Sequence, residues 1–340
     1  MADPRLIPDT ATRALGQGEY LAQHAGQVRE AAQRIAPHVK RTPAIASDLA
    51  PGMVLKCECF QPTGSFKVRG AFNAVLALRE RHPAVAGVIA VSSGNHAQAV
   101  ALAARTAGLT AVILIPHDAN PQKIAATRAL GAEVITEGIT FENREQCVRQ
   151  VAQARGLALI HPFDDWDVIH GQGTAALELL EQSPKLGLVA MPIGGGGLAS
   201  GSALALKAQR PDIKIVAVEP EHADDAFRSW QTGVLQTLPS APQTIADGVR
   251  AVAIGERNFE VLVERRLIDA IVTVSEAELE RSLLRAWTGA KLALEPTAAL
   301  PLAAALSGKL DAWRGTESTL GLMLTGGNFD PALVARLLSR

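Results

Sequence analysis

The chain of 340 residues has few cysteines, few aromatic residues and no excess of either charge. Its three cysteines, Cys57, Cys59 and Cys147, cannot build a disulfide framework and form no Cys-x-x-Cys pair, which favours a reducing cytoplasm. A net charge of −1 leaves no basic surface for nucleic acid or an anionic membrane. No run approaches the roughly 20 apolar residues of a membrane span. The first residues, MADPRLIPDTATRALG, contain no apolar stretch typical of a secretory signal. We therefore expect a soluble, cytoplasmic protein.

Hydrophobic residues make up 48% of the chain, which indicates a globular protein, and its length favours two domains. Short apolar runs alternate with helical patterns, first over residues 87–162 and again after residue 171. Strands and helices that alternate with short connections predict βαβ units and parallel sheets. We expect an α/β fold with two open, mainly parallel-sheet domains. Residues 1–83 and 163–340 would form a large, discontinuous domain, and residues 84–162 a small inserted one.

The segment GGGGLASG, residues 194–201, lies between an expected strand and an expected helix. Consecutive glycines let backbone amides converge on an anion, and the following helix N-terminus adds its dipole. We interpret this segment as a phosphate site, although a tight turn would also use glycine. Gly194, Gly196 and Ala199 satisfy a loose G-x-G-x-x-A pattern as well. With Glu219 ending the next expected strand, a nicotinamide-binding interpretation stays open.

Polar residues also follow two other expected strands. SSGNHAQ, residues 92–98, comes after the strand at 88–91, and its hydroxyls, amide and helix N-terminus suit a carboxylate. A serine there is also an ordinary helix N-cap, and His96 is equally consistent with a packed histidine. LTGGN, residues 324–328, ends the last expected strand with a hydroxyl, and that segment is equally consistent with a turn.

Lys67 in GSFKVRG begins an expected helix and lies on its apolar face, with Ala71, Ala74 and Leu78. A cation is unfavourable in the first turn, where the helix dipole is positive. A lysine whose stem covers apolar surface is the ordinary explanation. A desolvated lysine, however, has a lowered pKa and is the nucleophile of Schiff-base chemistry. Together with a phosphate site and a carboxylate site, it indicates a cofactor that is a phosphorylated aldehyde.

Seven motifs carry a resemblance to a known family: GSFKVRGAFNA, SSGNHAQAVA, GQGTAALE, GGGGLASG, IADGV, EPTAA and LTGGN. In this order they resemble fold-type II pyridoxal-phosphate enzymes, whose fold is tryptophan synthase β-like with the active site between two domains. The chain is similar to the branch of threonine/serine dehydratases and serine racemases, which includes 3-hydroxyaspartate dehydratases. The resemblance runs from about residue 27 to the C-terminus. It makes the large domain the cofactor-binding one and the small domain the substrate-binding one.

The resemblance implies a role for each matching residue. Lys67 would be bonded to pyridoxal 5'-phosphate and would move the α-proton, and Phe66 would pack against the ring. Asn95 would bind the phenolic oxygen, and Thr325 would face the ring nitrogen. Ser93 would be the acid/base on the opposite face. The phosphate would be bound by Gly194, Gly195, Gly196, Gly197 and the amide of Leu198. The substrate carboxylate would be bound by Ser92, Ser93, Asn95 and His96.

VEPEHADDAF, residues 218–227, matches a divalent-cation site of the same branch. Glu219 and Asp225 would provide carboxylates and Ala223 its backbone carbonyl, an all-oxygen set suited to Mg²⁺ or Ca²⁺. An acidic surface loop is the alternative. The match makes Glu219 a cation ligand and argues against a contact with a ribose.

The implied activity is dehydration of a β-hydroxy amino acid, such as L-threonine or L-serine, to a 2-oxo acid and ammonia. Arg144 matches an arginine near the active site of serine racemase-like members. It would pair bidentately with a second substrate carboxylate, as in 3-hydroxyaspartate, or else be a solvated helix residue. Serine racemase activity, a nicotinamide-dependent oxidoreductase and a non-catalytic cofactor- or metabolite-binding protein remain the alternatives. The resemblance also implies a homodimer.

Overall fold

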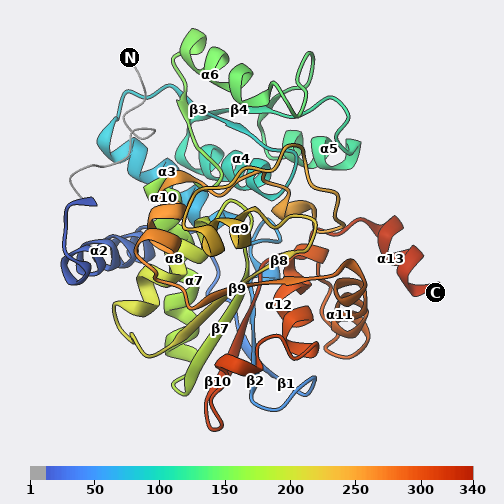
Figure 1. Cartoon of the computed structure of the whole chain (residues 1–340). Coiled ribbons are helices and arrows are strands. Elements are labelled where there is room, and N and C mark those ends of the chain that lie inside the picture. The colour runs from blue at the N-terminus through green and yellow to red at the C-terminus, as the bar shows by residue number, and fades with distance from the viewer. Residues whose placement is uncertain (1–12, 340) are drawn as a thin grey trace.

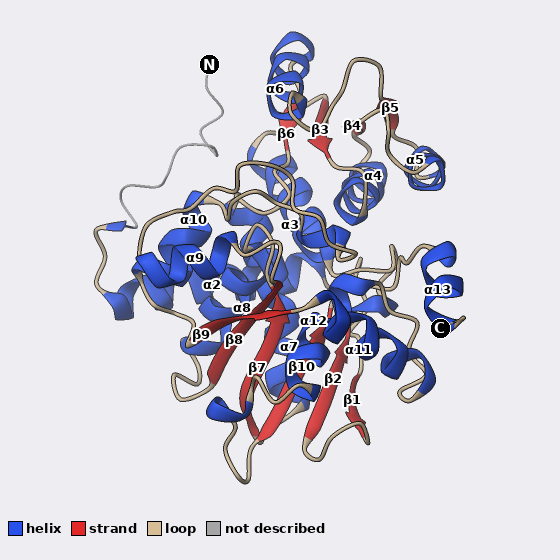
Figure 2. Cartoon of the chain, turned by 45° about the vertical axis from the view of Figure 1, so that its right-hand side comes forward, coloured by secondary structure: helices blue, strands red, loops and turns tan. Residues whose placement is uncertain are grey.

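The computed structural model describes residues 13–339 and contains two open sheets, one above the other, with helices on both faces of each (Figures 1 and 2). The expected α/β fold with two mainly parallel sheets is confirmed. The expectation about a secretory signal rests mostly on residues 1–12, which lie outside the described residues.

The larger sheet has six strands in the order β1-β2-β10-β7-β8-β9. All neighbouring pairs are parallel except β1 and β2, which are antiparallel. The sequence patterns did not predict β1 and β2, because β1 is a short, half-exposed edge strand and β2 carries a buried lysine, Lys56. The strands are β1 (Ala44–Ser47), β2 (Met53–Cys57), β7 (Leu186–Pro192), β8 (Lys214–Pro220), β9 (Ala270–Val274) and β10 (Thr319–Leu324).

The smaller sheet is parallel throughout, with the order β5-β4-β3-β6. Its strands lie within residues 87–159, inside the segment expected for the small domain. They are β3 (Gly87–Val91), β4 (Thr110–Leu114), β5 (Glu133–Ile135) and β6 (Ala158–Leu159).

Helices cover both faces of each sheet because alternate strand residues point to opposite sides. In β7, for example, Val189 packs with α2, α7 and α8, whereas Leu188 packs with α11 and α12. The smaller sheet packs against α3 and α4 on one face and α6 on the other. The helices are α2 (Gln17–Ile35), α3 (Lys67–Arg81), α4 (Asn95–Ala107), α5 (Pro121–Ala129), α6 (Arg144–Arg155), α7 (Trp166–Gln182), α8 (Gly197–Lys207), α9 (Asp225–Thr232), α10 (Glu256–Phe259), α11 (Glu276–Thr288), α12 (Pro296–Leu306) and α13 (Pro331–Leu338). Shorter turns of helix are η2 (Glu58–Phe60), η3 (Asp247–Val249), η4 (Glu260–Glu264) and η5 (Asp311–Trp313).

The division into a large and a small domain at residues 83/84 and 162/163 stays a proposal. Helix α3, which precedes the first boundary, contributes Val68, Ala71 and Phe72 to the same hydrophobic cluster as β3 and α4. By packing, therefore, α3 belongs with the smaller sheet as much as with the larger one.

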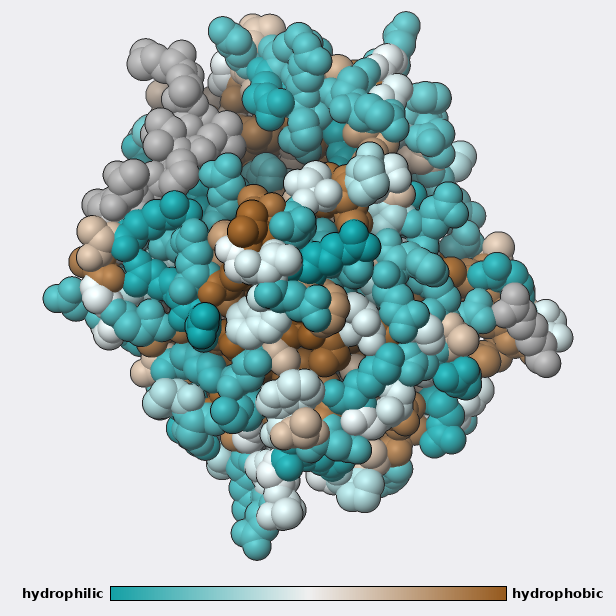
Figure 3. Space-filling model, viewed as in Figure 1, coloured by the Kyte–Doolittle hydropathy of each residue, from teal (hydrophilic) through white to brown (hydrophobic). Residues whose placement is uncertain are grey.

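Hydrophilic residues dominate the face shown in Figure 3, and hydrophobic residues gather near its centre. No helix in the described part of the chain combines the length and the apolar character that crossing a bilayer requires.

Candidate active site

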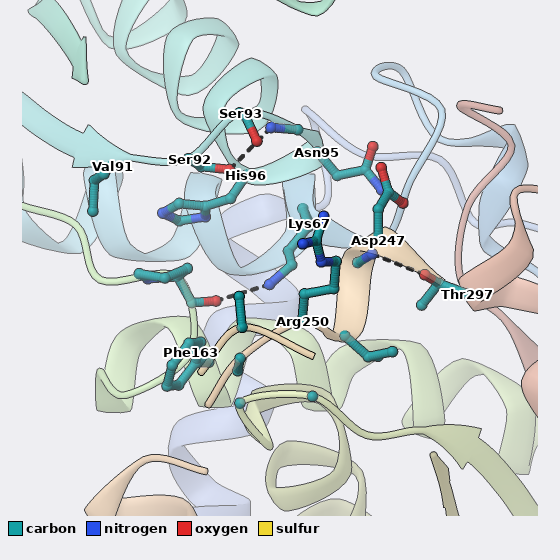
Figure 4. A pocket seen from close by; sticks show the side chains of 18 of the residues that line it. Lys67, Val91, Ser92, Ser93, Asn95, His96, Phe163, Asp247, Arg250 and Thr297 are labelled. Atoms are coloured by element: carbon teal, nitrogen blue, oxygen red, sulfur yellow. Dashed lines mark hydrogen bonds between the residues drawn. The ribbon is translucent and has the colours of Figure 1, made fainter. Parts of the chain in front are cut away.

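A cavity of about 820 Å³ lies between the two sheets and is lined by loops from both. It brings together the segments that follow β3, β7 and β10 with the first residue of α3. In Figure 4, Lys67 points into the pocket, with Ser93 and Asn95 on one wall and Asp247 and Thr297 on another. Segments expected to bind a phosphate, a carboxylate and an aldehyde thus share one cavity.

Lys67 begins α3 and is held there by the turn before it. The Phe66 amide donates to the Thr325 carbonyl at 3.0 Å, and the Gly327 amide donates to the Gly64 carbonyl at 2.9 Å. These bonds tie the turn to the end of β10, and the helix begins at Lys67. The first turn of α3 has no acidic residue that would pair with the ammonium group.

The amine of Lys67 is buried and has little compensation for its charge. Its Nζ donates to the Pro162 carbonyl at 2.9 Å. Burial lowers its pKa to about 8, although the charge of Glu295 acts in the opposite direction. A lysine with this pKa is partly neutral near pH 8, which a nucleophilic amine requires.

The glycine loop after β7, residues 194–197, has no side chain of its own to cover the backbone amides. Gly196 has φ +97°, a conformation that side chains disfavour, and α8 begins at the next residue. A Cβ on Gly195 would overlap the ring of Phe163, and one on Gly194 would lie 3.0 Å from Val249 Cα. The loop therefore offers amides and a helix N-terminus at the cavity, the arrangement that binds a phosphate.

Thr325 and Asn95 provide polar groups beside Lys67. The Thr325 hydroxyl is buried and has no hydrogen-bond partner among the described residues. Asn95 Nδ2 donates to the Glu295 carboxylate at 2.9 and 3.0 Å, and Asn95 Oδ1 accepts from Asn328 Nδ2 at 2.8 Å. These contacts fix the orientation of the Asn95 amide at the cavity wall.

Glu295 was missed as a functional residue, although EPTAA was among the motifs. Burial raises the pKa of its carboxyl to about 7, the charge of Asp247 acts in the same direction, and the bond from Asn95 opposes them. The Glu295 carboxyl therefore changes its protonation state near pH 7, and it is in direct contact with the Asn95 amide.

The serines and histidine after β3 also line the cavity. The Gly94 amide donates to Ser92 Oγ at 3.2 Å, so the Ser92 side chain stabilises the turn that precedes α4. His96 is only 2% exposed, and its Nε2 lies 2.9 Å from the Ile160 carbonyl oxygen. Burial lowers the pKa of His96 to about 3, so the ring is neutral. The substrate-binding roles of Ser92, Ser93, Asn95 and His96 stay predictions.

These features define a class of enzyme, one that joins a lysine to a phosphorylated aldehyde. The bare glycine loop, the unpartnered Thr325 hydroxyl and the desolvated Lys67 all fit such a cofactor. A family model described as "Pyridoxal-phosphate dependent enzyme" matches residues 35–326. The chain belongs to this family, and its cofactor is pyridoxal phosphate.

Several characterised proteins are similar over nearly the whole chain. L-threo-3-hydroxyaspartate ammonia-lyase from Pseudomonas sp is 43% identical over 316 residues, which cover 92% of this chain and 97% of that relative. Serine racemase from Oryza sativa subsp. indica is 42% identical over 311 residues, with coverages of 89% and 90%. The crystal structure of threonine deaminase from T.th. has a TM-score of 0.84 and 46% identity, covering 90% of this chain and 98% of that one.

The nicotinamide interpretation of the glycine loop is wrong. The family binds a different cofactor, and Glu219 does not line the cavity, so it is not placed to contact a ribose there. Instead, Glu219 Oε1 accepts a hydrogen bond from the Phe227 amide at 2.7 Å.

Glu219 and Asp225 form a buried acidic pair away from the cavity, each 1% exposed. Burial raises the pKa of Asp225 to about 7, and burial with the charge of Asp225 raises that of Glu219 well above its usual range. Asp225 Oδ2 has no hydrogen-bond partner among the described residues. Two carboxylates and an unpaired oxygen fit a divalent cation. Within residues 13–339 no group of three or more His, Cys, Asp or Glu side chains is suited to a metal, so backbone or water oxygens would complete the set.

Arg144 lies at the start of α6 and lines the cavity. Its guanidinium carbon is 3.5 Å from the Phe141 ring centroid, and its nearest carboxylate is Glu145, at 3.9 Å. Cavity residues that the sequence analysis did not assign include Phe163, Lys123, Asp247, Arg250, Glu295 and Thr297. Asp247 and Glu295 belong to the motifs IADGV and EPTAA, which were the only signal for them.

Proposed function

We propose that this protein is a pyridoxal-phosphate-dependent dehydratase that converts a β-hydroxy amino acid, such as L-threonine or L-serine, to a 2-oxo acid and ammonia. The observation that carries this proposal is the pairing of the desolvated Lys67 amine with the unpartnered Thr325 hydroxyl in one cavity. A hydroxyl, unlike a carboxylate, does not hold a ring nitrogen protonated. The cofactor is then a weaker electron sink, which favours prompt loss of a β-leaving group. The names of the relatives agree with this chemistry.

Each residue has a definite task in this reaction. When bound, the cofactor accepts the substrate amine and delocalises charge from the α-carbon. Ser92, Ser93 and the N-terminus of α4 bind the substrate carboxylate. Lys67, once its amine is free, removes the α-proton, because a neutral amine with a lowered pKa is a competent base at neutral pH. The β-hydroxyl takes up one proton and leaves as water, which balances the α-proton that Lys67 removes. Hydrolysis of the resulting imine gives the 2-oxo acid and ammonia.

A second candidate substrate is 3-hydroxyaspartate. Arg144 supports it, because its side chain is 23% exposed, lines the cavity and has no carboxylate within hydrogen-bonding distance among the described residues. Serine racemase activity is a further alternative, with Ser93 as the acid/base opposite Lys67.

Release of 2-oxo acid from a substrate panel with Mg²⁺ present tests the proposal. The panel contains L- and D-serine, L-threonine and the four isomers of 3-hydroxyaspartate. We expect turnover of at least one member, with the amino acid and the 2-oxo acid in a one-to-one balance. Interconversion of L- and D-serine without 2-oxo acid would make the protein a racemase. A protein that holds the cofactor and turns over none of them would be a binding protein.

We also propose that Glu219, Asp225 and the Ala223 carbonyl bind Mg²⁺ or Ca²⁺. Saturating cation is expected to raise the melting temperature of the wild type by several degrees, because a ligand at 100 times its Kd adds about 2.7 kcal/mol. In Asp225→Asn the shift disappears, and without cation this variant is more stable than the wild type, since the amide relieves the repulsion on Glu219. Differential scanning fluorimetry with EDTA and with each cation measures both effects.

Glu221→Gln is the matched control, because Glu221 is an exposed carboxylate of the same segment. It should keep the full cation-dependent shift. An Asp225→Asn variant that keeps this shift would place the cation elsewhere.

A homodimer and a cytoplasmic location complete the proposal. The location is supported by Cys57, Cys59 and Cys147, all of which are free thiols. Light scattering after size-exclusion chromatography tests the dimer, which a mass of one chain would reject.

A further inference from the structure

A second arginine, Arg250, reaches the cavity from the opposite sheet. It follows η3 in the larger-sheet half of the chain, and its Nε donates to the Pro242 carbonyl at 3.0 Å. This bond anchors the side chain, and Figure 4 shows it directed into the pocket beside Lys67 and Asp247. Among the described residues, no carboxylate pairs with its guanidinium group.

Arg144 and Arg250 both line this cavity, one from α6 and the other from the segment after η3. Burial lowers the pKa of Arg144, and the charge of Arg250 lowers it further, although Glu145 and Glu142 oppose this. Two guanidinium groups that face one half-buried space repel, and an anion between them removes that repulsion. Arginine is also the side chain best shaped to bind a carboxylate bidentately.

Among the described residues, none of the acidic side chains that line the cavity lies within hydrogen-bonding distance of Arg144 or Arg250; they are Asp118, Glu142, Glu145, Asp247 and Glu295. Asp247 pairs with Lys123 from α5, and Glu295 accepts hydrogen bonds from the Asn95 side chain and the Asn328 backbone. Glu145, the nearest carboxylate to Arg144, has a side chain that is 43% exposed and lies beyond hydrogen-bonding distance. In the proposed reaction, the glycine loop binds the cofactor phosphate and the serines after β3 bind the substrate α-carboxylate. The arginine pair is therefore left for a further anionic group.

We propose that Arg250 and Arg144, one from each sheet, together bind the distal carboxylate of a dicarboxylic substrate, and that Arg250 is a specificity-determining residue. This inference rests on the proposed dehydratase function and narrows its substrate to a 3-hydroxyaspartate isomer. A monocarboxylic substrate leaves both guanidinium groups without an anion, so serine and threonine bind less well.

We call the pair of Arg144 and Arg250 the clamp. The variants Arg250→Gln and Arg144→Gln test it, with Arg155→Gln as the control. At position 250, glutamine keeps a nitrogen donor where Nε bonds to the Pro242 carbonyl, but it lacks the charged end of the guanidinium group. Arg155 lies on α6 with Arg144, but is exposed and paired with Glu133. We expect Arg250→Gln to lower kcat/KM for the preferred 3-hydroxyaspartate isomer by at least about 30-fold. The ratio of kcat/KM for this isomer to kcat/KM for L-serine should fall as well, because serine has no distal carboxylate. Arg155→Gln should leave both values unchanged.

Calorimetric binding of malonate and acetate to the cofactor-loaded protein gives a readout that needs no turnover. Malonate should bind the wild type more tightly than acetate, and Arg250→Gln should remove the difference. If this holds while no hydroxy amino acid is turned over, the clamp stands and the dehydratase proposal fails. If serine or threonine is turned over and malonate binds no better than acetate, the clamp is wrong and the dehydratase stands. Weaker cofactor binding by Arg250→Gln, with unchanged substrate preference, would assign Arg250 to the phosphate and overturn the clamp.

Discussion

Lys67→Ala is expected to lower kcat for 2-oxo acid release by at least about 1,000-fold and to leave the fold intact. Alanine removes both the amine that bonds to the cofactor and the base that moves the α-proton. It also removes an ammonium group whose charge is disfavoured by burial, although it donates to the Pro162 carbonyl, so stability should not fall. Steady-state kinetics, the visible absorbance of lysine-bound cofactor and a melting curve measure the three effects. Lys185→Ala, at an exposed lysine, should behave as wild type.

The same lysine sets a pH dependence for cofactor capture. Only the neutral amine reacts with an aldehyde, and burial lowers the pKa of Lys67 to about 8. The rate at which cofactor-free protein binds pyridoxal phosphate should therefore rise with pH and level off above about 8. A midpoint above about pH 10 would mean that the amine is as basic as a solvated lysine, and would contradict the desolvation argument.

Arg69→Met is expected to lower the free energy of unfolding by about 3–5 kcal/mol, because it leaves a buried carboxylate without its partner. Arg69 is fully buried, and its Nε and one terminal nitrogen donate to Glu58 at 2.7 and 2.8 Å. A further donor reaches Glu178 at 2.8 Å. Chemical denaturation of the wild type and the variant at pH 7 measures the difference.

The loss of unfolding free energy in Arg69→Met should become smaller as the pH falls. Burial alone would raise the pKa of Glu58, but the charge and hydrogen bonds of Arg69 hold it below its usual range. In the wild type this contributes stability above the ordinary pKa of a glutamate, which is lost in acid. Without Arg69, burial raises the pKa of Glu58, so the variant gains relative stability as Glu58 is protonated. The difference is thus largest near pH 7 and smallest near pH 4.

Arg41→Met is the control for this series. Arg41 pairs with Glu181 at the surface, where both side chains are more than half exposed. Its removal should change stability by less than about 1 kcal/mol at every pH. A loss in Arg69→Met no larger than in Arg41→Met would mean that the buried network does not stabilise α3.

The meeting of the main site residues was predictable from the sequence. The segments GGGG and LTGGN each follow a recognisable strand of the larger sheet, and the carboxyl ends of parallel strands meet at one edge of a sheet. SSGN follows a strand of the smaller sheet, and its meeting with the other two was predicted by the resemblance, which puts the active site between two domains. Lys67 was found by its awkward place at the start of an apolar helix face. The family resemblance then assigned a task to each of them.

The remaining cavity residues were not predictable from local patterns. Arg250 lies in an irregular segment where periodicity carries no signal. Its proposed role depends on sharing the cavity with Arg144, 106 positions earlier in the chain. Glu295 precedes α12 and looks like an ordinary helix start until its contact with Asn95 is seen. Such pairings arise from tertiary packing between segments that are remote in sequence.

The two proposed attachment points of the cofactor belong to different hydrophobic cores. Lys67 begins α3, which packs with β3 and α4, whereas the glycine loop joins β7 to α8 in the core of the larger sheet. A molecule held at both points is a cross-link between the two cores. Without a cofactor at both points, the halves are joined by apolar packing, such as that of α3 with Val168 of α7, and by side-chain contacts such as Lys123 with Asp247. We therefore expect cofactor-free protein to be cleaved by proteases faster than cofactor-loaded protein.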